Sequence, residues 1–229
     1  MDAAADPPDT LPPLMNMSTV IDHLVVTAPT LDVGAAYVHR HLGVMPQAGG
    51  THIKMGTHNM LLRLDESIYL EVIAIDPTGA PPSQPRWFGL DRLRHDAPAS
   101  LGAWVASTSD IRATAEHASE DLGSVEAMTR GDLAWLITIP RNGRVPLDGC
   151  APTLIEWQSD THPASRLPDV GLRLVKLELH HPEPERLRTL FDAIDLRTPI
   201  DVVRIEHDAG AHLVAVIDTS QGLRTIATA

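Results

Sequence analysis

Hydrophobic and polar positions along this chain follow a recurring order: a strand-like run, a helix-like run and three further strand-like runs. The first run, Val20 to Thr27, is rich in β-branched residues and is predicted to be a strand. Thr30 and Gly43 are suitable helix caps, and the segment between them has apolar residues at helical spacing, at Leu31, Ala35, Val38 and Leu42. Three strands are then predicted, near Val44 to Lys54, Asn59 to Leu64 and Ile68 to Ile75.

The same β-α-β-β-β order returns after a proline-rich stretch from Pro77 to Pro85. Leu101 to Ser107 is predicted to be a strand, and Ser109 or Asp110 can cap a second helix. That helix is predicted from apolar residues at the same four offsets before Gly123, namely Ile111, Ala115, Ala118 and Leu122. Strands near Val125 to Arg130, Ala134 to Ile139 and Thr153 to Gln158 complete the second unit.

A third, weaker copy follows. It is predicted to have a strand at Leu172 to His180, a helix at Pro184 to Asp195, and strands near Val202 to His207, Ala211 to Asp218 and Leu223 to Thr228. Its last strand carries Arg224-Thr225-Ile226 at the place where the first two units carry a glutamate. We therefore interpret the third unit as a support.

Repetition of this kind predicts an α+β fold in which paired βαβββ modules curve their sheets toward each other and form a cleft. A third, degenerate βαβββ-like unit follows the pair. The predicted boundaries are a disordered or extended arm at 1–18, a first module at 19–76, a Pro-rich connector at 77–100, a second module at 101–159 and the third unit at 160–228.

Composition narrows the class of protein. The 229 residues are 43% hydrophobic, enough for a sizeable core, and the net charge of -12 disfavours nucleic acid and anionic membranes as partners. Cys150 is the single cysteine, and no apolar run reaches the length of a membrane span. No Gly-rich phosphate loop is present, so neither a nucleotide nor a flavin cofactor is expected. These features predict a cytoplasmic protein.

A carboxylate lies inside the last strand of the first unit. Strand alternation puts Glu71 on one face with Tyr69, Ile73 and Ile75. A buried carboxylate on an apolar face needs a metal, a cation or a hydrogen-bonding partner. The alternative is an edge strand with Glu71 facing water. Glu156 occupies the matching position in the second unit.

Several motifs together resemble the vicinal oxygen chelate superfamily, and more narrowly its glyoxalase-like domain branch. They are Ile21-Asp22-His23-Leu24-Val25, Gly50-x-His52-x-x-x-Gly56-Thr57-x-Asn59, Tyr69-Leu70-Glu71, Trp87-Phe88-Gly89-Leu90-Asp91 and Leu154-Ile155-Glu156-Trp157. The resemblance covers nearly all of residues 19–228 and implies paired βαβββ modules, with metal ligands on the first and last strands of each.

Position by position, the resemblance implies His23, Glu71 and Glu156 as metal ligands. The fourth place carries Ala103, with Trp104 beside it, and neither side chain can bind a cation. One imidazole and two carboxylates suit Mn²⁺, Fe²⁺, Zn²⁺ or Ni²⁺, and three ligands leave open positions for a substrate. For His23 the alternative is a core histidine satisfied by hydrogen bonds.

Other residues are candidates for catalysis or for the substrate pocket. Glu71 can act as a general base when it is not bound to a metal, and His52 can be a further ligand or a proton donor. Asn59 can orient a carbonyl or carboxylate group, whereas an exposed strand end is the alternative for His52. Trp87, Trp104 and Arg130 are predicted to line the pocket, although large aromatic residues more often belong to a core.

These candidates predict a metal-assisted lyase or isomerase acting on a small oxygenated organic molecule in the cleft between the modules. One alternative is a metal-free protein that binds or sequesters a small molecule, which the loss of the fourth ligand favours. A ring-cleaving dioxygenase is a further alternative and would need His52 as a second histidine ligand. Monomer and homodimer both stay open, because the third unit can cover an edge that relatives cover by dimerising.

Overall fold

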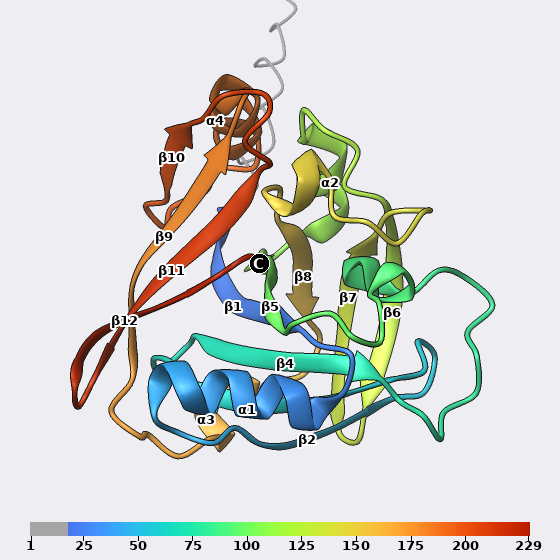
Figure 1. The fold of residues 1–229 in the computed structure, drawn as a ribbon. Coiled ribbons are helices and arrows are strands. Elements are labelled where there is room, and N and C mark those ends of the chain that lie inside the picture. Colours follow the sequence, from blue (N-terminus) through green and yellow to red (C-terminus); the bar gives the residue numbers. More distant parts are fainter. Residues whose placement is uncertain (1–17) are drawn as a thin grey trace, which may run out of the picture.

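Two β-sheets organise the chain, and the larger one contains both predicted modules (Figure 1). The computed structural model describes residues 18–229, so the predicted arm lies outside the described residues except for residue 18. The first module consists of β1 Val20–Thr27, α1 Leu31–Leu42, β2 Gln47–His52, β3 Thr57–Arg63 and β4 Tyr69–Ile75. The second consists of β5 Ser100–Ser107, α2 Ile111–His117, β6 Ser124–Arg130, β7 Leu133–Ile139 and β8 Thr153–Trp157.

The two modules share one strand-pairing scheme. The strand order of the large sheet is β2-β3-β4-β1-β5-β8-β7-β6, so each module forms one half. Within the halves β1 pairs in parallel with β4, and β5 pairs in parallel with β8. The halves join through the antiparallel pair of β1 and β5. The predicted α+β fold with paired βαβββ modules is confirmed.

Both predicted ends of the first helix are correct, whereas only the predicted start of the second helix is correct. The Thr30 side chain accepts a hydrogen bond from the Val33 N–H at the start of α1, and Gly43 ends it in the left-handed conformation with φ 76°. Asp110 caps α2, but the chain leaves the helix at Ala118, where ψ is 137°. Leu122 therefore reaches the core from an extended segment rather than from a helix face.

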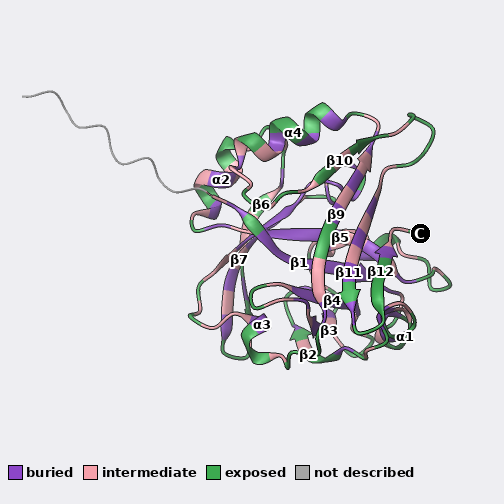
Figure 2. Ribbon diagram, turned by 90° about the vertical axis from the view of Figure 1, so that its left-hand side faces the viewer, coloured by how far each residue is buried: buried purple, intermediate pink, exposed green. Residues whose placement is uncertain are grey.

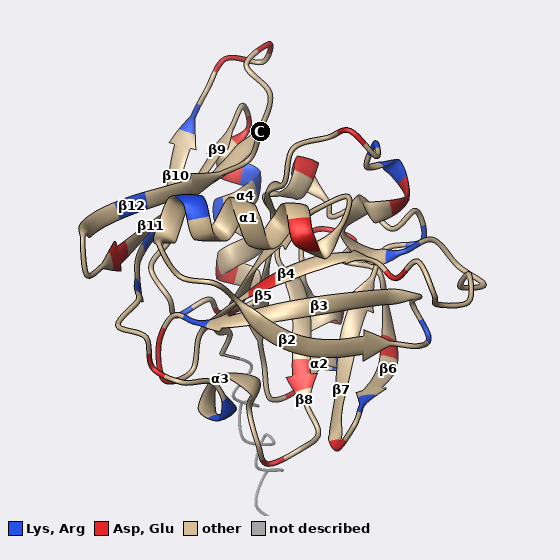
Figure 3. Ribbon diagram, turned by 60° about the horizontal axis from the view of Figure 1, so that its bottom comes forward, with Lys and Arg blue, Asp and Glu red and all other residues tan. Residues whose placement is uncertain are grey.

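The large sheet curls until its two edges meet. The edge strands β2 and β6 contact each other, and the Lys54 ammonium lies 2.7 Å from the Glu126 carboxylate across the seam. Figure 3 shows that most residues along the strands of the curl are neither acidic nor basic. The connector between the modules contains a short 3₁₀ helix, η1 Trp87–Arg92, and a second, η2 Leu147–Gly149, precedes β8. The curl leaves an interior that is lined by both modules.

The third unit has the predicted order of elements but a different strand pairing. A short helix, α3 Pro163–Arg166, precedes it, and its elements are β9 Arg173–His181, α4 Pro184–Ala193, β10 Asp201–Arg204, β11 His212–Thr219 and β12 Gly222–Ala227. Its sheet has the order β10-β9-β11-β12, so its first strand lies between the second and the third. In the first two modules the first strand pairs with the fourth. The third unit is therefore not a copy of their sheet.

The third unit covers the outer face of the large sheet at its middle. Strands β11 and β12 contact β5, and β12 also contacts α1, where the Tyr37 hydroxyl donates to the Ala227 carbonyl at 3.2 Å. Trp104 of β5 is fully buried on this side, with its ring edge-on to Phe191 and its Nε1–H donating to the Cys150 carbonyl at 3.0 Å. The expectation that this unit covers a sheet edge is wrong, because the edges are β2 and β6.

Burial follows from this layering. Every residue of β1 after Val20 is buried, since one face lines the interior and the other lies under covering elements. Figure 2 shows the same contrast between the buried central strands and the partly exposed helix α4. None of the helices in the described part of the chain combines the length and the apolar character that crossing a membrane requires.

Close packing of α1 on β4 makes one glycine sensitive to substitution. A Cβ at Gly34 would collide with Val72 Cγ1 and lie 2.9 Å from Ala28 Cβ. Overpacking at such a contact costs about 1–3 kcal/mol. Gly34→Ala is therefore expected to lower the melting temperature by about 2–4 °C for each kcal/mol lost, measured by calorimetry.

Gly210→Ala is the matched control, because a Cβ at Gly210 would meet open space. This variant is expected to melt at or slightly above the wild-type temperature. Equal melting temperatures for the two variants would contradict the close contact between α1 and β4.

Candidate functional site

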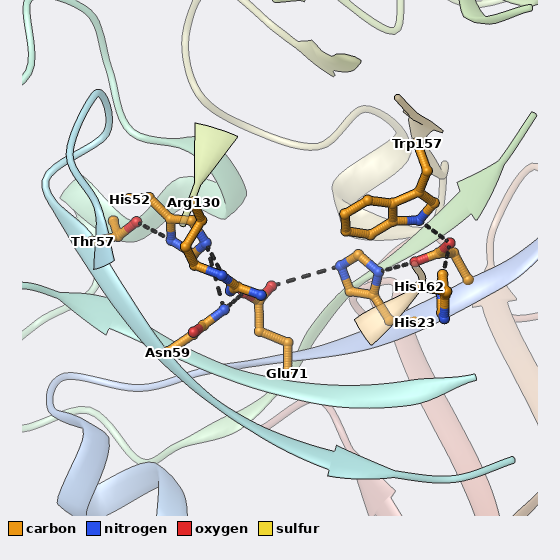
Figure 4. A network of polar contacts seen from close by, with 9 residues as sticks. His23, His52, Thr57, Asn59, Glu71, Arg130, Trp157 and His162 are labelled. Atoms are coloured by element: carbon orange, nitrogen blue, oxygen red, sulfur yellow. Dashed lines mark hydrogen bonds and ion pairs between the residues drawn. The ribbon is translucent and has the colours of Figure 1, made fainter. Parts of the chain in front are cut away.

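A small cavity inside the curl brings together charged and aromatic side chains from both modules (Figure 4). Its volume is about 20 Å³, room for about one water molecule. Strand alternation contributes pairs of lining residues two apart from β4, β7 and β8. The lining residues are His23, His52, Tyr69, Glu71, Trp87, Phe88, Arg130, Trp135, Ile137, Ile155 and Trp157.

Glu71 is buried on the inner face of β4, at 5% exposure, so the alternative in which it faces water is wrong. Its Oε1 accepts a hydrogen bond from Asn59 Nδ2 at 2.5 Å, and its Oε2 lies 3.7 Å from His23 Nε2. Burial alone would raise the pKa of Glu71, but the His23 imidazolium and the Asn59 amide outweigh it and hold the pKa at about 2. Glu71 is therefore an ionised carboxylate in a nearly dry site.

His23 lies between two carboxylates. Its Nδ1–H donates to Asp22 Oδ1 at 2.6 Å, its Nε2 points toward Glu71, and its ring stacks on Tyr69 at 4.4 Å between centroids. Burial by itself lowers the pKa of His23, but Asp22 and Glu71 raise it to about 9. His23 is thus an imidazolium at neutral pH, and its Nε2–H faces the cavity.

Asp22 completes this group and was not predicted as a site residue. Strict alternation would place Asp22 on the face opposite His23, but the β1–β5 register steps from Ile21 to His23 and leaves Asp22 as an extra residue. Such a bulge turns two adjacent side chains toward one side. Asp22 is 2% exposed and accepts hydrogen bonds from Trp157 Nε1 at 2.8 Å and His162 Nε2 at 3.1 Å. These contacts tie β1 to β8 and to the linker that follows β8.

The charge state of Asp22 follows from its partners. Burial alone would raise the pKa of this carboxyl group, whereas the hydrogen bonds from His162 and His23 lower it, to about 2. The charges of Asp22 and Glu71 therefore flank a single imidazolium. The aspartate in the Ile21-Asp22-His23 motif was visible in the sequence, but alternation hid its direction.

His52 is buried at the end of β2 and is neutral. Its Nδ1 lies 3.1 Å from the Thr57 hydroxyl, and its Nε2 lies 3.3 Å from Arg130 Nη1 and 3.5 Å from Asn59 Nδ2. Because the guanidinium and the amide are donors, Nε2 is the acceptor and the ring proton is on Nδ1. Burial is the largest cause of a pKa lowered to about 4, and Arg130 lowers it further. The exposed-strand alternative for His52 is wrong.

Asn59 holds its amide in one orientation with the help of two glycines. The Gly50 N–H donates to Asn59 Oδ1 at 2.9 Å, which leaves Nδ2 to donate to Glu71. Gly49 is the extra residue of a bulge in β2, and a Cβ at this position would collide with Asn59 Oδ1. Gly49 therefore leaves the room that the Asn59 side chain occupies.

Two further predicted residues lie elsewhere. Glu156 projects from the face of β8 opposite Ile155 and Trp157, and its carboxylate accepts the Ile111 N–H at 2.8 Å at the start of α2. Trp104 lies on the outer side of β5 and does not line the cavity. The predictions of Glu156 as a metal ligand and Trp104 as a pocket residue therefore disagree with the structure, whereas Trp87 and Arg130 do line the cavity.

Comparison with known proteins agrees with this architecture. Residues 21–194 match the protein family described as the Glyoxalase-like domain. The chain belongs to the glyoxalase-like domain family. Comparison with curated proteins gives no significant match.

Three solved structures are similar to this glyoxalase-like domain protein, and the first of them supports the fold. A hypothetical protein from Staphylococcus aureus matches with a TM-score of 0.55 and 15% identity, over 88% of this chain and 82% of that one. A variant of Streptomyces coelicolor methylmalonyl-CoA epimerase in complex with 2-nitronate-propionyl-CoA matches with a TM-score of 0.39 and 14% identity. The match covers 61% of this chain and 97% of that one. Methylmalonyl-CoA epimerase from Mycobacterium tuberculosis matches with a TM-score of 0.39 and 14% identity, over 60% of this chain and 85% of that one.

Members of the vicinal oxygen chelate superfamily often bind divalent metals, but the residues of this glyoxalase-like domain do not fit such a site. Glu156 faces away from the cavity, so the predicted set of three ligands is incomplete. Within residues 18–229, no group of three or more His, Cys, Asp or Glu side chains is placed to hold an ion. His23 Nε2 and Glu71 Oε2 face each other, and two ligands are fewer than the three of a catalytic zinc site.

The two cavity histidines are expected to titrate on opposite sides of the ordinary histidine range. His23, with a pKa of about 9, should carry protons on both ring nitrogens at about pH 7.5. His52, with a pKa of about 4, should be neutral at about pH 5.5, with its proton on Nδ1. Long-range ¹H–¹⁵N correlation spectra measure both states, with assignments from His23→Gln and His52→Gln.

Asp22→Asn removes one of the two charges that hold the His23 proton. The pKa of His23 should then fall while the His52 signals stay in place. A neutral His23 at about pH 7.5 in the wild type would contradict the charge assignment.

Proposed function

We propose that this glyoxalase-like domain protein binds a small oxygenated organic molecule at the cavity and transfers a proton on it, as an isomerase or lyase. Its own side chains, rather than a metal held by His23, Glu71 and Glu156, supply the acid and base. The observation that carries the proposal is the buried pair of His23 Nε2 and Glu71 Oε2, which are 3.7 Å apart and face the cavity.

This pair offers a donor and an acceptor to one substrate group. The His23 Nε2–H can donate to a carbonyl oxygen, and the negative charge that develops on that oxygen in an enolate is stabilised by the imidazolium. Glu71 can take the proton from the carbon next to the carbonyl group. Return of that proton gives an isomer, and loss of a leaving group from the neighbouring carbon gives a lyase product.

Substrate binding would also strengthen Glu71 as a base. The low pKa of Glu71 depends on His23 and Asn59. When His23 donates to a substrate oxygen instead, the carboxylate loses part of that stabilisation and its pKa rises toward the ordinary value. Asp22 keeps the imidazole oriented in the meantime, because it holds Nδ1 at 2.6 Å.

The walls of the cavity favour a planar or apolar substrate body. Trp87, Trp135 and Trp157 lie around the charged group, with the Trp135 and Trp157 rings 5.6 Å apart. Indole faces provide apolar contact area and exclude water, which strengthens hydrogen bonds to the reacting oxygen. His52 is held to Arg130 by its Nε2, which does not suit the second-histidine role that an iron dioxygenase requires.

A second candidate is a protein that binds the same kind of molecule without reacting it. The observation that favours it is the complete pairing of Asp22 and Glu71, both with pKa values near 2, which makes them weak bases in the unliganded protein. Binding alone would then be the function.

Hydrogen exchange separates the two candidates. A panel of 2-oxo acids, acyl thioesters and thiol adducts of 2-oxoaldehydes is incubated with the protein in D₂O, and loss of the signal from the hydrogen next to the carbonyl is followed by ¹H NMR. At least one compound should exchange this hydrogen for deuterium in the presence of the wild-type protein. Glu71→Gln should slow the exchange about 10²-fold or more.

Glu156→Gln is the matched control, since it alters the equivalent glutamate of the second module on the opposite face of its strand. It should leave the exchange rate unchanged. Saturable binding without exchange would favour the binding protein, and neither binding nor exchange across the panel would contradict both candidates.

Metal content is expected to be substoichiometric and independent of Glu71. The reason is that His23 and Glu71 supply only two facing ligands. Inductively coupled plasma mass spectrometry of protein purified without added metal or chelator measures this, with Glu71→Gln beside it. Near-stoichiometric metal that disappears in Glu71→Gln would overturn the metal-independent mechanism.

A further inference from the structure

We propose that Arg130 closes the cavity and selects ligands that carry an anionic group, above all a carboxylate. This inference rests on the proposed function, because it names the class of molecule that reaches His23 and Glu71. It begins with the size of the cavity, since about 20 Å³ admits a water molecule but not an organic ligand. A side chain in the wall must therefore move.

An open groove of about 580 Å³ lies directly outside the cavity. One side of it is the edge strand β2, the other is the turn between β6 and β7, and α3 lies at one end. Among the described residues, Arg130 alone lines both the groove and the cavity. It therefore stands where a ligand would pass from one to the other, and Figure 4 shows it in contact with His52.

The chain makes room for Arg130 in this position. A Cβ on Gly50 would lie 2.9 Å from Arg130 Cδ, so the arginine stem rests on bare backbone. Most of the neighbouring wall residues are large rings or short branched side chains, which have few rotatable bonds. The arginine side chain has several. Arg130 is thus the part of the wall that moves with least disturbance to the sheet.

Arg130 also lacks a carboxylate partner within the described residues. Its recorded polar contact is Nη1 to the neutral ring of His52 at 3.3 Å. By contrast, Arg166 in the same groove makes two contacts with Asp132, at 2.7 and 2.6 Å, and Lys54 at the seam pairs with Glu126. The Arg130 guanidinium therefore retains N–H donors for an anion.

A carboxylate is the group that these donors fit best. A guanidinium binds a carboxylate with two parallel charge-assisted hydrogen bonds, which are about twice as strong as a bond to a neutral acceptor such as His52. A ligand with an anionic group would draw Arg130 off His52 and open the way to the cavity. The ligand class is then a planar or apolar body that carries a carbonyl or hydroxyl oxygen for His23 and an anion for Arg130.

Benzoate and benzamide test this recognition, because they have nearly the same shape and differ in charge. Binding is measured by quenching of tryptophan fluorescence and by calorimetry. The wild type should bind benzoate about tenfold or more tightly than benzamide, and Arg130→Gln should weaken benzoate binding about tenfold or more. Benzamide binding should change by less than about threefold, because its amide makes no ion pair.

Two further variants keep the test independent of a folding defect. Gly50→Ala retains the charge but displaces the arginine stem, and it should weaken benzoate binding while the melting temperature stays near that of the wild type. Arg141→Gln removes one exposed positive charge from the loop after β7 and should leave benzoate binding unchanged. Phosphate in place of benzoate shows whether any anion suffices or a carboxylate is required.

Lack of saturable benzoate binding to the wild type would overturn the proposal, and so would equal losses in Arg130→Gln and Arg141→Gln. The hydrogen-exchange experiment reports separately on the proposed function. If hydrogen exchange depends on Glu71 but Arg130→Gln leaves benzoate binding unchanged, this inference is contradicted and the proposed function is not. Arg130-dependent binding without exchange would sink the proposed reaction alone.

Discussion

The structure depends on one imidazolium held between two buried carboxylates. Asp22 and Glu71 together carry more negative charge than His23 neutralises, and neither carboxylate is open to water. Three further donors stabilise the two carboxylates: Trp157 and His162 donate to Asp22, and Asn59 donates to Glu71. The surrounding elements position these donors beside the two carboxylates.

The duplicated modules have diverged in what they contribute to this centre. The first module supplies His23, Asp22 and Glu71, and the second supplies Arg130, Trp135 and Trp157. The pairing scheme of the two halves is the same, yet Glu156, the counterpart of Glu71, bonds to the start of α2 instead of facing the cavity. This asymmetry places a buried ion pair from one module beside aromatic surface from the other.

Much of the fold could be predicted from the sequence, because it depends on periodicity. The repeat of strand, helix and three strands predicted the paired modules, and Thr30 and Gly43 predicted the ends of α1. The pairing of the third unit was not predictable in the same way, since order along the chain does not determine order in a sheet. The early end of α2 was missed because Leu122 continues an apolar spacing that the backbone abandons at Ala118.

The site was predictable only as far as local rules held. Glu71, His23, His52 and Asn59 do gather, as their motif suggested, and Trp87 and Arg130 lie beside them. The prediction for Glu156 is wrong because an equivalent position in the repeat does not guarantee that the side chain points the same way. In β8 it is Ile155 and Trp157 that face the cavity. Asp22 was missed because one extra residue in β1 breaks the alternation from which its direction was inferred.

That extra residue also bears on how the domain holds together. Asp22 belongs to the first module, yet Trp157 and His162, which bond to it, come from the end of the second module and from the segment leading to the third. The negative charge that keeps His23 protonated is therefore satisfied only when distant parts of the chain are assembled. Separating the modules would leave the Asp22 carboxylate without Trp157 and His162. Assembly of the domain and formation of its chemical centre are therefore a single cooperative event.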